Sequence, residues 1–165
     1  MNKFLSMRTG SWLRRNKAAR STTAYSRAET IGVIFCIEDE KLLTEYDSFI
    51  HKLRNDNKQV TVLAYFPKKI ALYDYKYEFF TPQNISFWGN YNTDEVSNFV
   101  EQSFDYLFHL SDKPSAVVNG ILAQSKAKCR IGKYAESHDP YYELMINTKQ
   151  KDYLEEMYNY TSILN

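Results

Sequence analysis

Apolar residues follow two spacings along this chain: continuous in some stretches, and every three or four positions in others. Three continuous runs, rich in β-branched or aromatic residues, lie at Thr30–Ile37, Val60–Phe66 and Tyr106–Leu110, and a fourth predicted strand, Lys-Cys-Arg-Ile-Gly, lies at 128–132. Such runs are typical of strands buried on both faces. We therefore expect these four strands to be neighbours in one sheet.

Amphipathic helices are predicted where apolar residues recur every three or four positions. The predicted helices cover residues 40–55, 92–104, 115–125 and 149–164, and a last strand lies at Tyr141–Ile146. Because strands and helices alternate, the sequence predicts a single three-layer Rossmann-like α/β domain. Its sheet should be mostly parallel, with about five or six strands.

The aromatic segment between these elements allows two interpretations. Alternation in Tyr73–Phe79 favours a short, half-exposed strand that covers the sheet edge. The alternative is a platform for nucleic-acid bases, because Lys68, Lys69 and Lys76 interleave with the rings.

Two local features follow this segment. Ile85–Trp88 should be a strand or tight crossing that buries Trp88, with Gly89 and Asn90 as the turn. Asn92 lies three residues before Glu95, as in a capping box, so we expect Asn92 to be the N-cap of the next helix.

A complete β-α-β unit extends from Phe104 to Gly132, with Pro114 near the start of its helix. Open parallel sheets bind ligands at the carboxyl ends of their strands. The candidate ligand-binding residues at this edge are Ser111, Asp112, Lys113, Gly132 and Lys133. No complete chemical motif accompanies them, so no catalytic residue is assigned.

Charge is distributed unevenly over the 165 residues. Seven of the 21 basic residues and none of the 20 acidic residues lie in residues 1–28, although the net charge is only +1. The remaining 14 basic and 20 acidic residues make residues 29–165 acidic. We therefore divide the chain into a basic N-terminal arm, 1–28, and an α/β domain, 29–165.

The N-terminal arm is the part of the sequence that most directly suggests a function. We expect one or two helical turns around Gly10 and an otherwise free, flexible leader, which could bind RNA, a ribosome or an anionic membrane surface. The candidate polyanion-binding residues are Arg8, Arg14, Arg15, Lys17 and Arg20. Alternatives are an arm that packs Trp12 and Leu13 on its own domain, or an organellar transit peptide.

Other residue types point away from catalysis and cofactors. Cys36 and Cys129 lie inside apolar runs, which predicts buried free thiols and a reducing, cytoplasmic location. No apolar run approaches the ~18 residues of a membrane span, and no signal-peptide pattern is present. The phosphate-binding glycines of a dinucleotide fold are missing, so we expect no cofactor.

The acidic residues and the histidines are also better explained by structural roles than by catalysis or metal binding. Glu38–Glu40 could bind a divalent cation, but acids at the start of the next helix more simply favour its dipole. His51 is expected on the surface, His109 in the core, and His138 and Asp139 in a turn.

The order of several short motifs resembles an uncharacterised family of small α/β proteins from Bacteroidota. These motifs are Ile31–Ile34, Ile85–Trp88, Ser125–Gly132, Leu144–Ile146 and Ile163–Asn165. Residues 104–132 are also similar to a β-α-β unit of heptosyltransferase-like glycosyltransferases, in which Ser-x-Ala-x-x-Arg-Ile-Gly follows such a helix. The second resemblance implies a Rossmann-like fold, whereas those enzymes need two such domains and this chain has room for one.

Two hypotheses emerge from the sequence. The first is a non-catalytic interaction module whose arm docks on an acidic partner. The second is a reduced sugar- or nucleotide-binding enzyme that uses the loops at 38–40, 111–113 and 132–133. A concave pocket shared by those loops would favour the second hypothesis, and side chains filling that space would favour the first.

Overall fold

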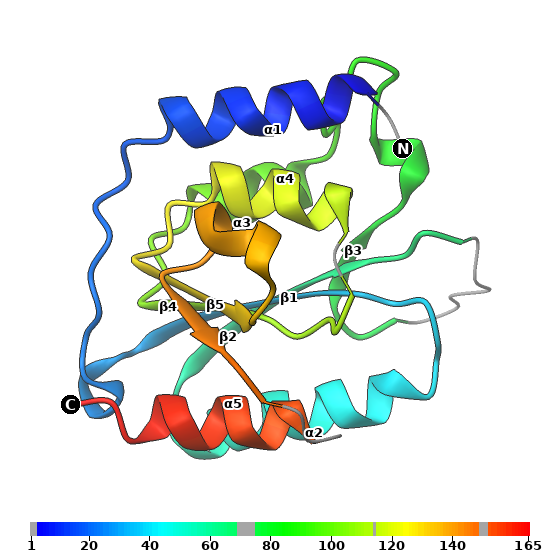
Figure 1. Ribbon diagram of the computed structural model, residues 1–165. Coiled ribbons are helices and arrows are strands. Elements are labelled where there is room, and N and C mark those ends of the chain that lie inside the picture. The colour runs from blue at the N-terminus through cyan, green and yellow to red at the C-terminus, as the bar shows by residue number, and fades with distance from the viewer. Residues whose placement is uncertain (1–2, 69–74, 114, 149–151) are drawn as a thin grey trace.

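The structure is a computed structural model that describes residues 3–68, 75–113, 115–148 and 152–165 (Figure 1). Predicted features at Lys69, Tyr73, Pro114 and Lys149 lie outside these ranges.

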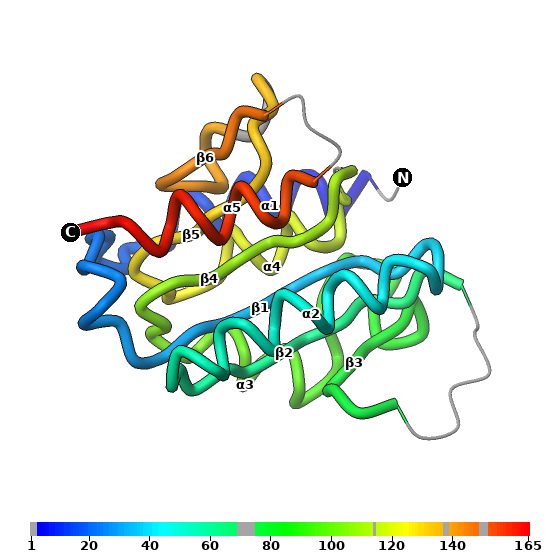
Figure 2. Tube along the Cα trace, turned by 90° about the horizontal axis from the view of Figure 1, so that it is seen from below, coloured from blue at the N-terminus to red at the C-terminus, as the bar shows by residue number. Residues whose placement is uncertain are grey.

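Six strands form one parallel sheet in the order β3-β2-β1-β4-β5-β6, which can be followed in Figure 2. Ile31 of β1 pairs with Val60 of β2 on one side and with Tyr106 of β4 on the other. The four strands that we expected to be neighbours, β2, β1, β4 and β5, are therefore adjacent in the sheet. The strands are β1 (Thr30–Cys36), β2 (Gln59–Tyr65), β3 (Glu78–Phe80), β4 (Tyr106–His109), β5 (Cys129–Lys133) and β6 (Leu144–Ile146).

Helices cover both faces of this sheet (Figure 1). Helices α2 and α5 lie on one face and α3 and α4 on the other, while α1 lies outside α4, away from the sheet. The helices are α1 (Lys3–Arg15), α2 (Leu42–Asn55), α3 (Asp94–Glu101), α4 (Ala116–Gln124) and α5 (Tyr153–Ser162). Short 3₁₀ segments are η1 (Tyr25–Arg27), η2 (Pro82–Asn84) and η3 (Glu136–Tyr141), and η3 contains the predicted turn at 138–139.

Two apolar layers hold the sheet between the helices. Val33 and Phe35 of β1 face the layer under α2 and α5, whereas Ile34 and Cys36 face the layer under α3 and α4. Successive side chains of a strand point to opposite faces, so a strand covered on both sides must be apolar throughout. This requirement explains why the continuous runs could be recognised in the sequence.

Two local predictions are wrong. Trp88 is 59% exposed, because Gly89 adopts a left-handed conformation (φ 78°) that closes a tight turn and leaves the tryptophan on its outside. Ile85 and Tyr91 form an antiparallel bridge across this turn, and Tyr91 points inward instead. The N-cap of α3 is Thr93 rather than Asn92, because the Asn92 amide donates to the Asn84 carbonyl before the helix begins.

The edge strand predicted in the aromatic segment is present but begins later than expected. It is β3, which starts at Glu78 and pairs in parallel with β2. Its position at the end of the sheet agrees with the covering role proposed from the alternating sequence.

The prediction of a free N-terminal arm is also wrong for the described residues. α1 is 13 residues long and packs along α4, rather than forming one or two turns of a flexible leader. Leu5 and Tyr25 are buried, as is Ala28 at the end of the segment. The arm therefore forms an additional layer of the domain.

Candidate functional site

The predicted ligand-binding residues lie at the carboxyl end of the sheet, where their polar side chains contact other groups of this chain. The Ser111 hydroxyl accepts a hydrogen bond from the Cys36 amide at 2.7 Å. Lys133 forms an ion pair with Asp112, and Lys113 lies 3.7 Å from Glu38. Two ion pairs therefore cross this edge: Lys113 after β4 pairs with Glu38 after β1, and Lys133 of β5 pairs with Asp112 after β4.

Tyr142 fills the space between these loops, and the sequence analysis did not identify it. A Cβ atom on Gly132 would overlap the Tyr142 ring, so this glycine gives room to a side chain of the same molecule. The Tyr142 hydroxyl lies 2.6 Å from Nδ1 of His109, which is buried as predicted. The remaining cavity has a volume of about 20 Å³, enough for roughly one water molecule.

The acidic loop at 38–40 shows no metal-binding geometry. Over the described residues, no group of three or more His, Cys, Asp or Glu side chains converges as a metal would require. Asp39 instead accepts a hydrogen bond from the Lys41 amide at 3.0 Å, just before α2 begins. This arrangement matches the prediction that these acids start the helix.

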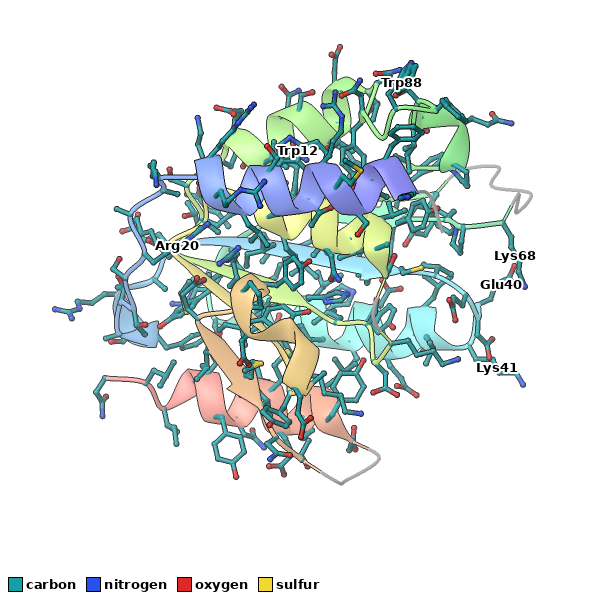
Figure 3. All side chains as sticks on the ribbon, turned by 45° about the horizontal axis from the view of Figure 1, so that its top comes forward. Trp12, Arg20, Glu40, Lys41, Lys68 and Trp88 are labelled. Carbon is teal, nitrogen blue, oxygen red and sulfur yellow. The ribbon has the colours of Figure 1, made fainter. Side chains whose placement is uncertain are left out.

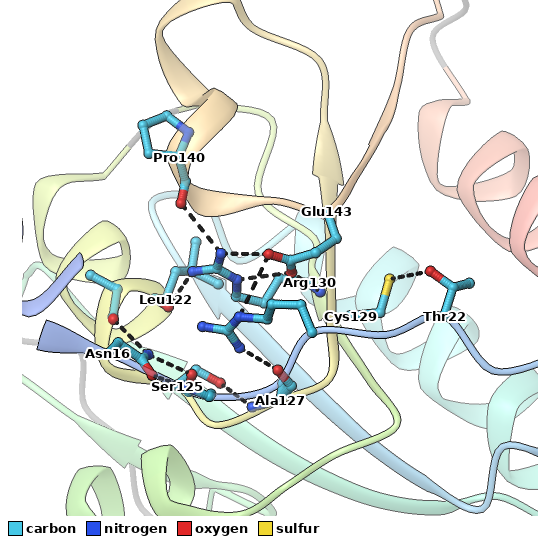
Figure 4. A network of polar contacts seen from close by, with 12 residues as sticks. Asn16, Thr22, Leu122, Ser125, Ala127, Cys129, Arg130, Pro140 and Glu143 are labelled. Carbon is cyan, nitrogen blue, oxygen red and sulfur yellow. Dashed lines mark hydrogen bonds and ion pairs between the residues drawn. The ribbon is translucent and has the colours of Figure 1, made fainter. Parts of the chain in front are cut away.

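The second predicted site, the basic arm, is attached to the domain through main-chain groups (Figure 4). Asn16 donates to the carbonyl oxygens of Ala123 and Ser125, at 2.9 Å each, where α4 ends. The last carbonyl groups of a helix have no partners within it, so Asn16 supplies the missing donors. Further along, the amides of Ser21 and Tyr25 donate to Lys128 and Leu164.

Arg20 belongs to a partly buried ionic network rather than to an open surface. Its Nε lies 3.6 Å from a Glu143 oxygen, and its guanidinium donates to the Ala127 carbonyl. Arg130, only 5% exposed, makes a two-point contact with Glu143 at 2.6 and 3.0 Å (Figure 4). Burial alone would raise the pKa of Glu143, but the hydrogen bonds and charge of Arg130 outweigh it and lower the pKa.

α1 is held along its length by close contacts with α4 and with the turn at 85–91. The backbone of Leu5 packs on Gly89, and the Trp12 ring lies 5.8 Å from that of Tyr91. A Cβ on Gly120 of α4 would overlap the Tyr91 hydroxyl, so glycine is needed for this approach. The predicted alternative, in which Trp12 packs on its own domain, is confirmed.

The outer face of this anchored helix is basic. Arg8, Arg14 and Arg15 of α1 and Lys17 beyond it are all exposed. Across the described ranges, none of these four side chains has a carboxylate within ion-pair distance. They are four of the five cations predicted from the sequence, and the fifth is the half-buried, ion-paired Arg20.

An aromatic cluster adjoins these cations, which the sequence analysis did not predict. The Phe4 ring lies 5.4 Å from Phe87 and 5.0 Å from Trp88, and those two rings lie 5.4 Å apart. Figure 3 shows Trp88 on the same side of the molecule as α1. Phe4 belongs to α1 and the other two rings to the turn at 85–91, so only the folded chain brings them together.

Two grooves flank α1 and share Trp12 and Arg15 in their walls. The first, about 620 Å³, also contains Phe4, Arg8 and Trp88. The second, about 630 Å³, is lined on its other side by α3 and α4 and by the loop that precedes β5. Both grooves are large enough for a bound group, unlike the filled carboxyl edge.

Six parallel strands in this order, with helices on both faces, define a Rossmann-like α/β domain. The chain belongs to the Family of unknown function (DUF6913), whose model matches residues 2–164. The comparison with curated proteins finds no match. Among the helices of the described residues, none has both the length and the apolar composition to cross a bilayer.

Proposed function

We propose that this protein is a non-catalytic binding module that docks through the outer face of α1 onto a partner rich in phosphate groups. RNA, a ribosome and an anionic membrane surface share this chemistry. The observation that carries the proposal is the set of four exposed cations without acidic partners among the described residues: Arg8, Arg14, Arg15 and Lys17.

Anchoring of the helix gives the proposed binding surface a fixed backbone. The Asn16 hydrogen bonds and the Trp12 contacts fix the backbone that carries the cations. A preordered helix loses less conformational entropy on binding than a flexible arm would. The cations remain in water, where their attraction to phosphates is long-ranged and sensitive to salt.

The alternative, a reduced sugar- or nucleotide-binding enzyme related to one half of a glycosyltransferase, receives less support. Its site would be the carboxyl edge, where Tyr142 leaves a cavity of about 20 Å³. Small-molecule sites usually measure roughly 300–1,000 Å³. Within the proposal we also keep the cytoplasmic location, which rests on the two buried thiols at Cys36 and Cys129.

The test is a variant that removes the four charges while keeping helix-forming side chains. It carries Arg8→Gln, Arg14→Gln, Arg15→Gln and Lys17→Gln. A matched control removes four exposed cations outside α1: Arg27→Gln, Lys41→Gln, Arg54→Gln and Lys68→Gln. Each protein is titrated at low and moderate salt against single-stranded oligouridine RNA and against vesicles that contain phosphatidylglycerol.

We expect the unmodified protein and the control to bind at least one of the two probes, with affinity that falls as salt rises. The α1 variant should bind that probe at least about tenfold more weakly, because each cation near a phosphate surface contributes on the order of 1 kcal/mol. Equal binding by the α1 variant and the control would refute the proposal. So would failure of the unmodified protein to bind either probe.

A further inference from the structure

Exposed apolar side chains gather at one end of the basic helix. Among the described residues, eight large hydrophobic side chains are exposed, and four of them lie here: Phe4, Met7, Phe87 and Trp88. Phe87 is 72% exposed, Met7 65% and Trp88 59%. Isolated exposed apolar residues are common, but a contiguous group of this kind indicates a surface that another body covers.

Cations share a groove with this apolar group instead of lying on a separate face. Phe4, Met7 and Trp88 line the same groove as Arg8, Arg14 and Arg15. An apolar group with a basic rim has the distribution of charge and hydrophobicity found in helices that lie in the interface of an anionic bilayer. There, aromatic rings enter the headgroup region and cations remain beside the lipid phosphates.

The ring geometry favours lipid over nucleic acid. The planes of Phe4, Phe87 and Trp88 are inclined to one another by 52° to 82°. The three rings pack edge-on or tilted against one another and form a compact protruding cluster, which we call the aromatic knob. Successive bases of a nucleic acid stack on exposed ring faces, and this arrangement does not offer a series of parallel faces. Trp12, the other tryptophan, is half-buried and packs on Tyr91.

We infer that the partner is an anionic lipid bilayer, entered by the aromatic knob formed by Phe4, Phe87 and Trp88 while Arg8, Arg14 and Arg15 contact lipid phosphates. The inference rests on the proposed function, to which it adds the identity of the partner. The turn at 85–91 and the start of α1 then lie in the headgroup region, and the sheet remains in water.

Two serine substitutions, Phe87→Ser and Trp88→Ser, test the inference without disturbing the core, because both side chains are largely exposed. The matched control is Tyr160→Ser with Ile163→Ser, at side chains that are 52% and 69% exposed on and beside α5. Binding is measured by co-sedimentation with vesicles of phosphatidylcholine alone and of phosphatidylcholine with phosphatidylglycerol. Binding to oligouridine RNA is measured in parallel.

We expect binding to the anionic vesicles, and the knob variant should bind them on the order of tenfold more weakly than the unmodified protein. The Tyr160 and Ile163 control should bind as the unmodified protein does. Tryptophan emission should shift to the blue when anionic vesicles are added, and this shift should be lost in Trp88→Phe. Vesicle binding unaffected by the knob substitutions would overturn the inference.

The RNA-binding measurement distinguishes failure of the membrane inference from failure of the proposed function. Binding of oligouridine that depends on the α1 cations, without vesicle binding, would overturn the membrane inference and leave the proposed function standing. If neither probe binds, both are refuted.

Discussion

Replacing Glu143 with alanine should cause a large loss of stability, although this residue lies at the surface end of its network. Arg130 is 5% exposed and, among the described residues, its guanidinium would keep only its hydrogen bonds to the Leu122 and Pro140 carbonyls, at 2.9 and 3.3 Å. Its charge would then have no buried counterion. Removing one partner of a buried ion pair typically costs about 3–5 kcal/mol.

The lower end of that range applies here. The side chain of Glu143 is 22% exposed, so water can enter after truncation and solvate part of the Arg130 guanidinium. Arg20, which also contacts Glu143, lies partly in solvent and can turn outward. We therefore expect Glu143→Ala to lower the free energy of unfolding by about 3 kcal/mol.

Urea denaturation followed by far-ultraviolet circular dichroism measures this change. Glu101→Ala is the control, because Glu101 pairs with Lys126 at the surface, where both side chains are well exposed. Such a pair contributes about 0–1 kcal/mol. A loss below about 1 kcal/mol for Glu143→Ala would refute the reasoning. The double variant with Arg130→Met should recover much of the loss, since no unpaired charge would remain buried.

Three further predictions follow from the described contacts. Partial burial opposes ionisation of Asp105, but hydrogen bonds from Lys128 and two backbone amides lower its pKa to about 2. Its stabilisation is therefore complete above about pH 4 and lost as pH falls towards 2, so Asp105→Asn should cost about 2 kcal/mol at pH 7 and almost nothing near pH 2 in urea melts. A chain beginning at Glu29 should lose more than about 3 kcal/mol of unfolding free energy in the same assay, because buried side chains of the arm are removed. An unchanged urea midpoint would contradict this. Burial raises the pKa of Cys36 to about 12 and of Cys129 to about 11. Ellman's reagent should therefore label both thiols far more slowly in the native than in the unfolded protein. Equal labelling rates in the two states would contradict the burial of these thiols.

The strands of the sheet could be predicted because the burial of each strand is visible in the residues of that strand alone. Each central strand is covered on both faces, so burial appears directly as a continuous apolar run, as at Thr30–Ile37. The start of α3 was misplaced by one residue because Asn92 forms a backbone contact with Asn84 that no capping pattern reveals. Where a helix or strand begins or ends can depend on a single hydrogen bond of this kind, whereas the formation of the whole element depends on many side chains.

The sites were less predictable, because their chemistry depends on tertiary neighbours. Gly132 at the end of a strand indicates close approach, but the sequence cannot tell a ligand from the Tyr142 ring that occupies the space. The cations on and beside α1 were visible as a charge pattern, whereas the ion pair of Arg20 depends on Glu143, far along the chain. The aromatic cluster joins Phe4 to the turn at 85–91, and no local pattern contains that contact.

The two outermost strands are the shortest in the sheet, and this has a consequence for self-association. β3 and β6 each have three residues, whereas the central β1 and β2 each have seven. An exposed strand edge is a template for pairing with another molecule, and short edges limit the backbone that it can offer. Each of these two outer strands therefore offers only three residues for such pairing, which limits how much of its own edge could bind a second molecule.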